Sequence, residues 1–157
     1  NRQNILYGTG FTCGTGCRMN PGIQGKILIG NNVIMGDYCQ IEAMKKVSIG
    51  NDVLIASKVY IGDASHGNYS GENQSPPSQS PHDRCVTAKP VVIGNNVWIG
   101  NAVTIIGGVT VGDGAVIGAN AVVTRDVKEN MIVVGNPAKA VKKYDKDSGK
   151  WKRISGN

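Results

Sequence analysis

Two histidines are the side chains of this 157-residue sequence best suited to proton transfer near neutral pH. An unperturbed imidazole has a pKa of about 6.5, so its neutral form can take a proton from a hydroxyl group as that hydroxyl attacks an activated carbon. Both residues, His66 and His82, lie in one polar, proline-containing segment. We expect no metal, because the three-histidine site of metal-dependent carbonic anhydrase chemistry cannot be filled by two histidines.

The positive charge of the chain is concentrated near its end. The formal net charge is +6, and nine of the 17 Lys and Arg fall between Arg125 and Arg153. Such a cluster suits a phosphate-bearing ligand, with a solvated basic tail as the alternative. A nucleic-acid partner is not favoured, because the charge comes without a recognisable binding module or interleaved aromatic residues.

Several classes of protein are disfavoured by composition. No apolar run approaches the roughly 18 residues of a membrane span, and no signal-peptide pattern is visible. The four cysteines are too few and too scattered for a disulfide scaffold, so we expect small buried thiols in a reducing cytoplasm. Ile and Val number 34 against three Leu, which favours strands over a helix bundle.

A six-residue repeat must position the candidate groups. It reads apolar-x-apolar-Gly-x-x, so the first and third side chains of each unit share one face of a short strand. Position four is Gly in eight of twelve units, and position five is often Asn, Asp or Gly, residues that tolerate left-handed geometry. The units begin at Ile27, Val33, Cys39, Val47, Val53, Val59, Val91, Val97, Val103, Val109, Ala115 and Ala121.

Strands this short predict a solenoid, in which three six-residue sides make a triangular coil of about 18 residues. We therefore expect one all-β domain over 1–157, a parallel β-helix. Its parts are a degenerate coil over 5–26, coils over 27–64 and 91–127, a protruding loop over 65–90 and a capping segment over 128–157. The degenerate coil continues the apolar pattern weakly at Phe11, Cys13, Cys17, Met19 and Ile23. After Ala140 we expect a short helix or a tail that packs Tyr144 and Trp151 on the rod end.

The stretches IGNNVIMGDY, IGNNVWIGNAVTI and VGDGAVIGANAVV resemble the hexapeptide-repeat acyltransferases. The resemblance is greatest to lipopolysaccharide and capsule sugar O-acetyltransferases and to galactoside and maltose acetyltransferases. It implies a left-handed helix, although the general preference for right-handed crossovers predicts the opposite hand. It also implies acetyl-CoA as co-substrate and a homotrimer with its sites between subunits.

The resemblance also gives His66 a role. Counted from Val59, it takes an outward position at the root of the loop, where the sugar O-acetyltransferases carry their catalytic base. His82 is the competing base, or else a substrate contact. Asp63 or a backbone carbonyl is expected to orient the ring. Where galactoside-type relatives carry an acceptor-binding Asp, this chain has Met44, which argues against a galactoside acceptor.

The remaining site residues also follow from the resemblance. Trp98 and Tyr60 point outward and are expected to contact the acceptor or acyl group, or to serve in packing. The segment GNPAKAVKK resembles the C-terminal CoA motif of the family. The expected CoA contacts, from the thioester end to the phosphates, are Asn101 through its backbone amide, Ala119, Thr124, Arg125, Lys139 and Lys142.

The sequence therefore predicts a cytoplasmic O-acetyltransferase that moves acetyl from acetyl-CoA to a hydroxyl of a surface-polysaccharide sugar. Its acceptor would belong to lipopolysaccharide O-antigen or capsule. The alternatives are an N-acetyltransferase acting on an amino-sugar nucleotide, and a non-catalytic scaffold rod. The rod alone accounts for the repeat but not for His66 or the basic motif.

Overall fold

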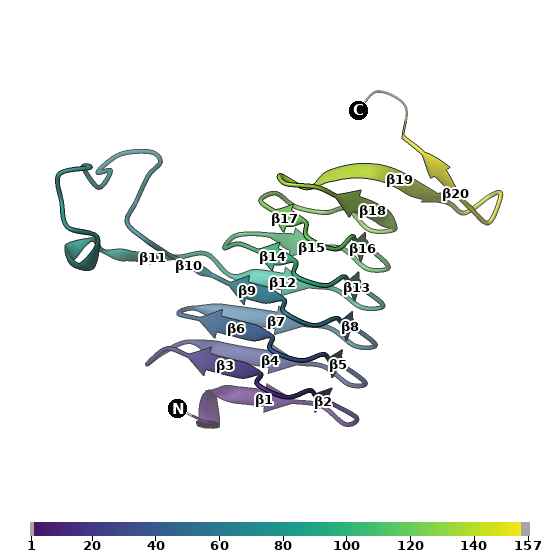
Figure 1. Cartoon of the computed structure of the whole chain (residues 1–157), viewed down its shortest axis with the longest axis horizontal. Coiled ribbons are helices and arrows are strands. Elements are labelled where there is room, and N and C mark those ends of the chain that lie inside the picture. The colour runs from purple at the N-terminus through teal and green to yellow at the C-terminus, as the bar shows by residue number, and fades with distance from the viewer. Residues whose placement is uncertain (1, 155–157) are drawn as a thin grey trace.

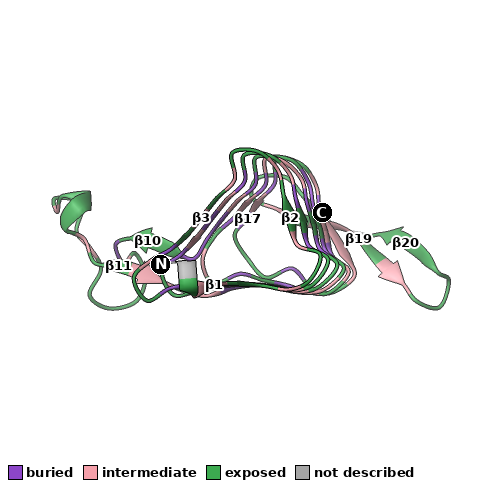
Figure 2. Ribbon diagram, turned by 90° about the horizontal axis from the view of Figure 1, so that it is seen from below, coloured by how far each residue is buried: buried purple, intermediate pink, exposed green. Residues whose placement is uncertain are grey.

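The computed structural model describes residues 2–154 and shows a triangular rod whose three sides are parallel sheets (Figure 1; Figure 2). The fold is the predicted left-handed parallel β-helix. Sheet A contains β1 (Ile5–Tyr7), β4 (Lys26–Ile29), β7 (Lys46–Ile49), β12 (Val91–Ile93) and β15 (Thr110–Val111). Sheet C contains β3 (Arg18–Pro21), β6 (Gln40–Ala43), β9 (Tyr60–Gly62), β14 (Thr104–Ile105) and β17 (Val122–Val123).

Sheet B is the longest of the three because the chain continues it beyond the rod. Its parallel strands are β2 (Thr12–Cys13), β5 (Ile34–Met35), β8 (Leu54–Ile55), β13 (Trp98–Ile99), β16 (Val116–Ile117) and β18 (Met131–Val134). The antiparallel strands β19 (Lys139–Asp145) and β20 (Lys150–Arg153) follow and form a hairpin. A 3-10 turn, η1 (Arg2–Asn4), precedes β1.

The core of the rod consists of the inward side chains of the repeat. The first and third positions of all twelve units are buried. Residues of equal position stack directly over one another, as Ile29, Ile49 and Ile93 do in sheet A. Stacked β-branched side chains bury apolar area continuously along the rod, which is the main favourable term in its stability.

The turns use the repeat differently from the prediction. Position six, and not position five, has the left-handed conformation, with φ of 54° at Asn32 and 62° at Lys58. The position-five side chain instead accepts a backbone N–H of the preceding coil, as the Asp113 carboxylate does from Asn95 at 2.7 Å. Position four is Gly because a Cβ at Gly94 would overlap that carboxylate.

The degenerate first coil is present, since β1, β2 and β3 pair in parallel with β4, β5 and β6. Three of its five expected apolar residues, Phe11, Cys17 and Met19, pack partly buried against the core. The other two are exposed. Cys13 is exposed in β2, and Ile23, in the bend before β4, is 87% exposed.

The thiols are also less buried than predicted. Cys39 is buried, and burial raises its pKa, so this thiol does not supply a thiolate at neutral pH. Cys13 and Cys85 are exposed, the latter in the arm outside the rod. The prediction of buried thiols is therefore wrong for these two.

The segment after Ala140 is a strand of a hairpin, so the short helix is wrong. A turn with Gly149 at φ 63° reverses the chain between β19 and β20. Tyr144 and Trp151 then pack on each other, edge to face at 5.4 Å, in a hairpin that extends away from the rod (Figure 1). The end of the core is instead covered in part by Ala138 and Ala140.

The polar insertion leaves the rod as an arm (Figure 1). Its root is an antiparallel ribbon of β10 (Ala64–His66) and β11 (Val86–Ala88), and η2 (Pro81–Asp83) lies farther out. Within residues 2–154 no helix is long and apolar enough to cross a membrane.

Candidate active site

His66 is held at the root of the arm with its side chain exposed, as its outward position predicted. It ends β10, directly opposite Val86 of β11. Its backbone carbonyl accepts a hydrogen bond from the Tyr69 hydroxyl at 2.5 Å, and that hydroxyl accepts one from Arg84 at 2.7 Å. The backbone that carries the imidazole is therefore fixed, whereas the ring stays open to a substrate.

Arg84 is a positioning residue that the sequence analysis missed. Its guanidinium lies 5.9 Å from the centre of the Tyr69 ring and donates twice to the Gln79 carbonyl, at 2.8 and 3.1 Å. It thus ties the outer part of the arm to the turn after His66. Its position as the one arginine of the 65–90 segment could have pointed to this role, since a planar guanidinium can hold several carbonyls at once.

Asp63 does not orient the His66 ring. It is 1% exposed, and its carboxylate accepts the backbone N–H groups of Met44, Lys45 and Lys46 at 2.7, 2.7 and 2.6 Å. Lys45 and Lys46 are two extra residues between the repeat units that begin at Cys39 and Val47. Their amides and that of Met44 bond to this carboxylate. The carboxylate is occupied by this turn, so that candidate role is wrong.

A second feature lies at the corner between sheets B and C, which we call the BC corner (residues 36–38, 56–58, 100–102 and 118–120). Here three successive position-five side chains, those of Asp37, Ser57 and Asn101, each accept a backbone N–H of the preceding coil. Thr15 donates to Asp37 at 2.8 Å, Asp37 to Ser57 at 3.1 Å, and Ser57 to the Asn101 side chain at 3.0 Å. These bonds form a continuous ladder up the corner.

The ladder stops at Asn101. The next position five is Ala119, whose methyl group accepts nothing, so no described residue accepts the Asn101 backbone N–H. Beside it is a hollow of about 170 Å³ lined by Asn101, Ala119, Trp98 and neighbouring aliphatic groups. A free N–H at an apolar hollow is suited to the oxygen of an acyl carbonyl.

Trp98 lines this hollow and is 52% exposed. It also belongs to an apolar row on the outer face of sheet B. Leu54 stacks directly beneath it and Ile34 beneath that, and these two are 47% and 53% exposed. Three large exposed apolar side chains in one row are typical of a surface that another subunit covers.

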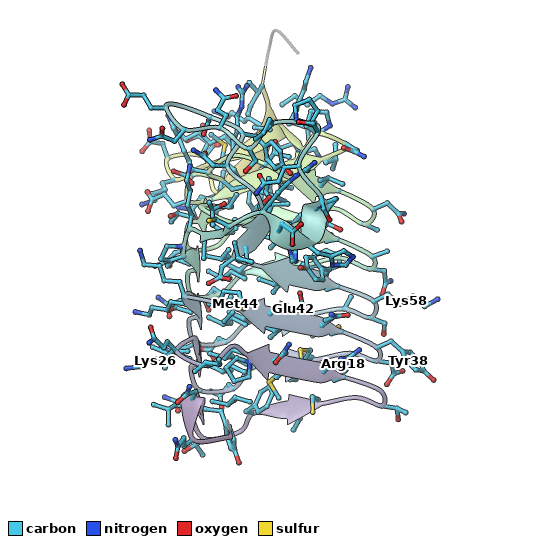
Figure 3. All side chains as sticks on the ribbon, turned by 90° about the vertical axis from the view of Figure 1, so that its left-hand side faces the viewer. Arg18, Lys26, Tyr38, Glu42, Met44 and Lys58 are labelled. Atoms are coloured by element: carbon cyan, nitrogen blue, oxygen red, sulfur yellow. The ribbon has the colours of Figure 1, made fainter. Side chains whose placement is uncertain are left out.

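Tyr60 lies on the outer face of sheet C, the face that carries Glu42 in Figure 3, and does not line the hollow beside Asn101. Its hydroxyl donates to the Glu42 carboxylate at 3.1 Å. Burial, and next the Glu42 hydrogen bond, raise the pKa of Tyr60, so it acts as a neutral donor rather than a base. His82 is exposed in η2, which ends at Asp83 shortly before β11 begins at Val86.

The other predicted CoA residues are scattered. Thr124 and Arg125 are exposed after β17, at the corner between sheets C and A from which the arm leaves. Lys139 and Lys142 lie on β19, opposite Val134 and Ile132. The structure therefore brings Asn101, Ala119 and Trp98 together, but it places His66 at a different corner of the same chain.

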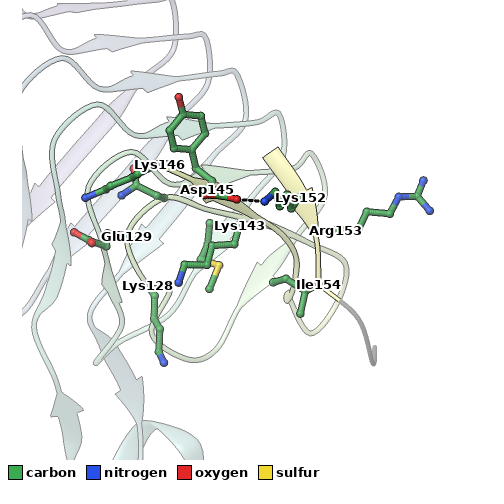
Figure 4. Close-up of a pocket in the computed structure, with 11 residues that line it drawn as sticks. Lys128, Glu129, Lys143, Asp145, Lys146, Lys152, Arg153 and Ile154 are labelled. Atoms are coloured by element: carbon green, nitrogen blue, oxygen red, sulfur yellow. Dashed lines mark ion pairs between the residues drawn. The ribbon is translucent and has the colours of Figure 1, made fainter. Parts of the chain in front are cut away.

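Two hollows larger than the one beside Asn101 lie elsewhere on the surface of the described residues. One, of about 630 Å³, lies at the arm root and is lined by Ser65, Asn68, Thr87 and Lys89, among others, but not by His66. The other, of about 710 Å³, lies between residues 128–131 and the β19–β20 hairpin (Figure 4). Among residues 2–154 no group of three His, Cys, Asp or Glu side chains could hold a metal ion.

Comparison with known proteins relates the chain to a defined family. The sequence profile of the bacterial transferase hexapeptide (six repeats) matches residues 90–125. The putative lipopolysaccharide biosynthesis O-acetyl transferase WbbJ of Escherichia coli (strain K12) is 40% identical over 154 residues, 98% of this chain and 79% of that protein. The chain therefore belongs to the bacterial hexapeptide-repeat transferases.

Solved structures agree on the fold. Galactoside acetyltransferase in complex with coenzyme A superposes with a TM-score of 0.66 at 26% identity, over 92% of this chain and 71% of that one. A point mutant of AntD, an N-acyltransferase from Bacillus cereus, in complex with an amino-sugar nucleotide and coenzyme A superposes with a TM-score of 0.72 at 20% identity. The match covers 93% of this chain and 81% of that one.

Proposed function

We propose that the protein is an acetyl-CoA-dependent O-acetyltransferase whose acceptor is a sugar hydroxyl of a surface polysaccharide. One observation carries the reaction type: the Asn101 backbone N–H has no acceptor among residues 2–154 and lies beside a hollow that can hold an acyl group. The relative named for lipopolysaccharide biosynthesis supports the sugar acceptor, and the neighbour with bound coenzyme A supports the donor.

His66 is the general base of this reaction. Its neutral imidazole takes the proton of the acceptor hydroxyl as the oxygen attacks the thioester carbon, and it returns the proton to the departing sulfur. General-base help of this kind contributes about 10²- to 10⁴-fold in rate. The Asn101 N–H donates to the carbonyl oxygen as negative charge develops on it, a contribution typically of about 10²- to 10³-fold.

The site forms between two copies of the chain. His66 and Asn101 lie at different corners of one rod, so one protomer supplies the base and its partner supplies the amide and the hollow. The row of Ile34, Leu54 and Trp98 supports such contact, since it leaves apolar area exposed along sheet B. A homotrimer with three equivalent sites meets this requirement.

The remaining residues bind the two substrates. Ala119 lies against the pantetheine arm, and Thr124, Arg125, Lys139 and Lys142 meet the adenosine and phosphates. The two lysines act as point charges there, where an arginine would bind a phosphate with two hydrogen bonds. Trp98 packs against the acyl group, and Tyr60 and His82 contact the acceptor. The reaction takes place in the cytoplasm.

The test is the variant His66→Ala with His82→Ala as its control. We expect His66→Ala to lower acetyl transfer to a panel of sugars at least 10²-fold, while calorimetry shows unchanged acetyl-CoA binding. His82→Ala is expected to keep most of its kcat and to raise only the KM for the sugar, because His82 contacts the acceptor without taking its proton. Retained turnover in His66→Ala, or a larger loss in His82→Ala, would assign the base to another residue.

The second candidate is N-acetyl transfer to an amino-sugar nucleotide, since AntD, which shares this fold, is an N-acyltransferase. The same panel separates the two, because NMR of the product locates the acetyl group on oxygen or on nitrogen. Sedimentation of the active protein tests the trimer, since an active monomer would contradict a site shared between subunits.

A further inference from the structure

The β19–β20 hairpin carries almost the whole net charge of the protein. Residues 139–153 contain seven Lys and Arg and two Asp, a formal charge of +5 out of +6 for the chain. The rest of the molecule is therefore close to neutral. The hairpin extends from one end of the rod, so this charge is presented away from the core (Figure 1).

The cations of the hairpin face one another across the two strands. Lys142 lies directly opposite Arg153, and Lys143 directly opposite Lys152. Like charges in directly opposed positions destabilise a strand pair unless an anion lies between them. Only one described partner is present, since Asp145 forms an ion pair with Lys152 (Figure 4). The pair of Lys142 and Arg153 has no ion-pair partner among residues 2–154.

The hollow at the base of the hairpin also has an excess of positive charge. It is lined by five cationic side chains and by only two carboxylates, those of Glu129 and Asp145. The cations come from four segments: the turn after Val127, the two hairpin strands and the turn that joins those strands (Figure 4). They are Lys128, Lys143, Lys146, Lys152 and Arg153. A negatively charged group such as a phosphodiester would neutralise them.

An aromatic pair accompanies the charge. Tyr144 and Trp151 stack edge to face across the strands, on the same face of the hairpin as Lys142 and Arg153, because side chains alternate along a strand. Trp151 is 38% exposed. Trp and Tyr beside Lys and Arg are the side chains that favour the interface between lipid headgroups and acyl chains.

We propose that the β19–β20 hairpin docks on the surface of a membrane containing anionic phospholipid. The phosphodiester headgroups offset the opposed cations, and Trp151 enters the interface. The two rings of the hairpin are packed on each other and so offer no stacking platform for bases, which is why a membrane fits better than a nucleic acid. Lys142 is also assigned to the proposed CoA site, so the test uses two lysines at the tip of the hairpin that lie outside that site.

The test measures co-sedimentation of the full-length protein with vesicles of phosphatidylcholine, with and without phosphatidylglycerol. We expect binding only with phosphatidylglycerol, and weaker binding as salt rises. Each cation near such a surface contributes about fivefold in affinity, so the exposed tip variant Lys146→Gln/Lys150→Gln should bind about 25-fold more weakly. CoA binding is expected to remain unchanged in this variant.

The matched control is Lys26→Gln/Lys46→Gln, which removes the same charge. These two lysines are also paired on neighbouring strands, but the strands are β4 and β7 of the rod and not those of the hairpin that carries Tyr144 and Trp151. We expect no more than a twofold loss. Equal losses in both variants, equal binding to neutral vesicles, tighter binding to a DNA duplex than to vesicles, or loss of CoA binding in the tip variant would each overturn the proposal.

Discussion

At two corners of the rod the position-five side chains accept backbone N–H groups of the preceding coil, and the two corners differ at one residue. At the corner between sheets A and B, which we call the AB corner, position-five side chains accept backbone N–H groups in four successive coils, from Asn31 through Asp113. At the BC corner the same ladder ends one coil earlier, because Ala119 stands where the AB corner has Asp113.

This difference separates a structural corner from a candidate active corner. The Asn95 N–H is accepted at 2.7 Å by Asp113, whereas the equivalent N–H of Asn101 has no acceptor among the described residues. An exposed N–H can still bond to water, so leaving it free has little effect on folding. It becomes valuable when a substrate oxygen takes its place.

The strongest test makes the BC corner like the AB corner. In Ala119→Asn the new carboxamide is expected to accept the Asn101 N–H, just as position-five side chains do elsewhere. Turnover should then fall about 10²- to 10³-fold, while the free energy of unfolding rises by about 1 kcal/mol. Acetyl-transfer kinetics and urea denaturation of the same sample measure both. Turnover within threefold of the parent would show that this amide takes no part in the reaction.

At the third corner, between sheets C and A, one position-five side chain accepts several backbone N–H groups, and this corner gives the largest expected effect on stability. Asp63 alone accepts three backbone N–H groups there, so Asp63→Ala leaves three amides without their acceptor. We expect a loss on the order of 3 kcal/mol in the free energy of unfolding, measured in urea. Asp63→Asn keeps the shape and one acceptor oxygen, so its loss should be smaller. Equal, small losses in both variants would contradict this role.

Much of the rod could be predicted because the repeat is local. A buried strand position every second residue and a turn every sixth residue fix both the sheets and their register. Counting alone therefore predicts that Ile29 and Ile93 point inward, and in the structure both pair with Ile49 of β7. The hairpin was missed for the opposite reason. Its strands are stabilised by cross-strand contacts such as Tyr144 with Trp151, which no periodicity encodes.

The candidate site divides in the same way. Exposure of His66 followed from counting positions, but the Tyr69 and Arg84 contacts that hold its backbone join residues of an irregular arm. The sequence shows that Ala119 stands where the other units of the BC corner have a polar residue at position five. It does not show the consequence, because only the structure reveals that the position-five side chain accepts the N–H of the preceding coil. Expecting left-handed backbone at that position concealed this function.

A smaller effect is expected when the AB ladder is cut. Asp113→Ala removes the acceptor of the Asn95 N–H. The Asn95 N–H of the AB corner then has no side-chain acceptor, just like the Asn101 N–H of the BC corner. We expect a loss of about 1 kcal/mol in stability and no change in acetyl transfer, since no described hollow of the AB corner lies beside that amide. A fall in turnover that exceeds the loss of folded protein would argue that both corners serve the reaction.

The smallest effect should come from a lower rung of the BC ladder. Ser57→Ala removes the hydroxyl that accepts the Asp37 N–H at 3.1 Å, two coils below the break. That amide is exposed and can bond to water instead, so the free energy of unfolding should fall by only about 0.5 kcal/mol. Turnover should stay at the parent value, because a free N–H at this level has no acyl hollow beside it. If Ser57→Ala instead lowered turnover as Ala119→Asn does, the ladder as a whole would shape the site, and the special status of the Asn101 amide would be lost.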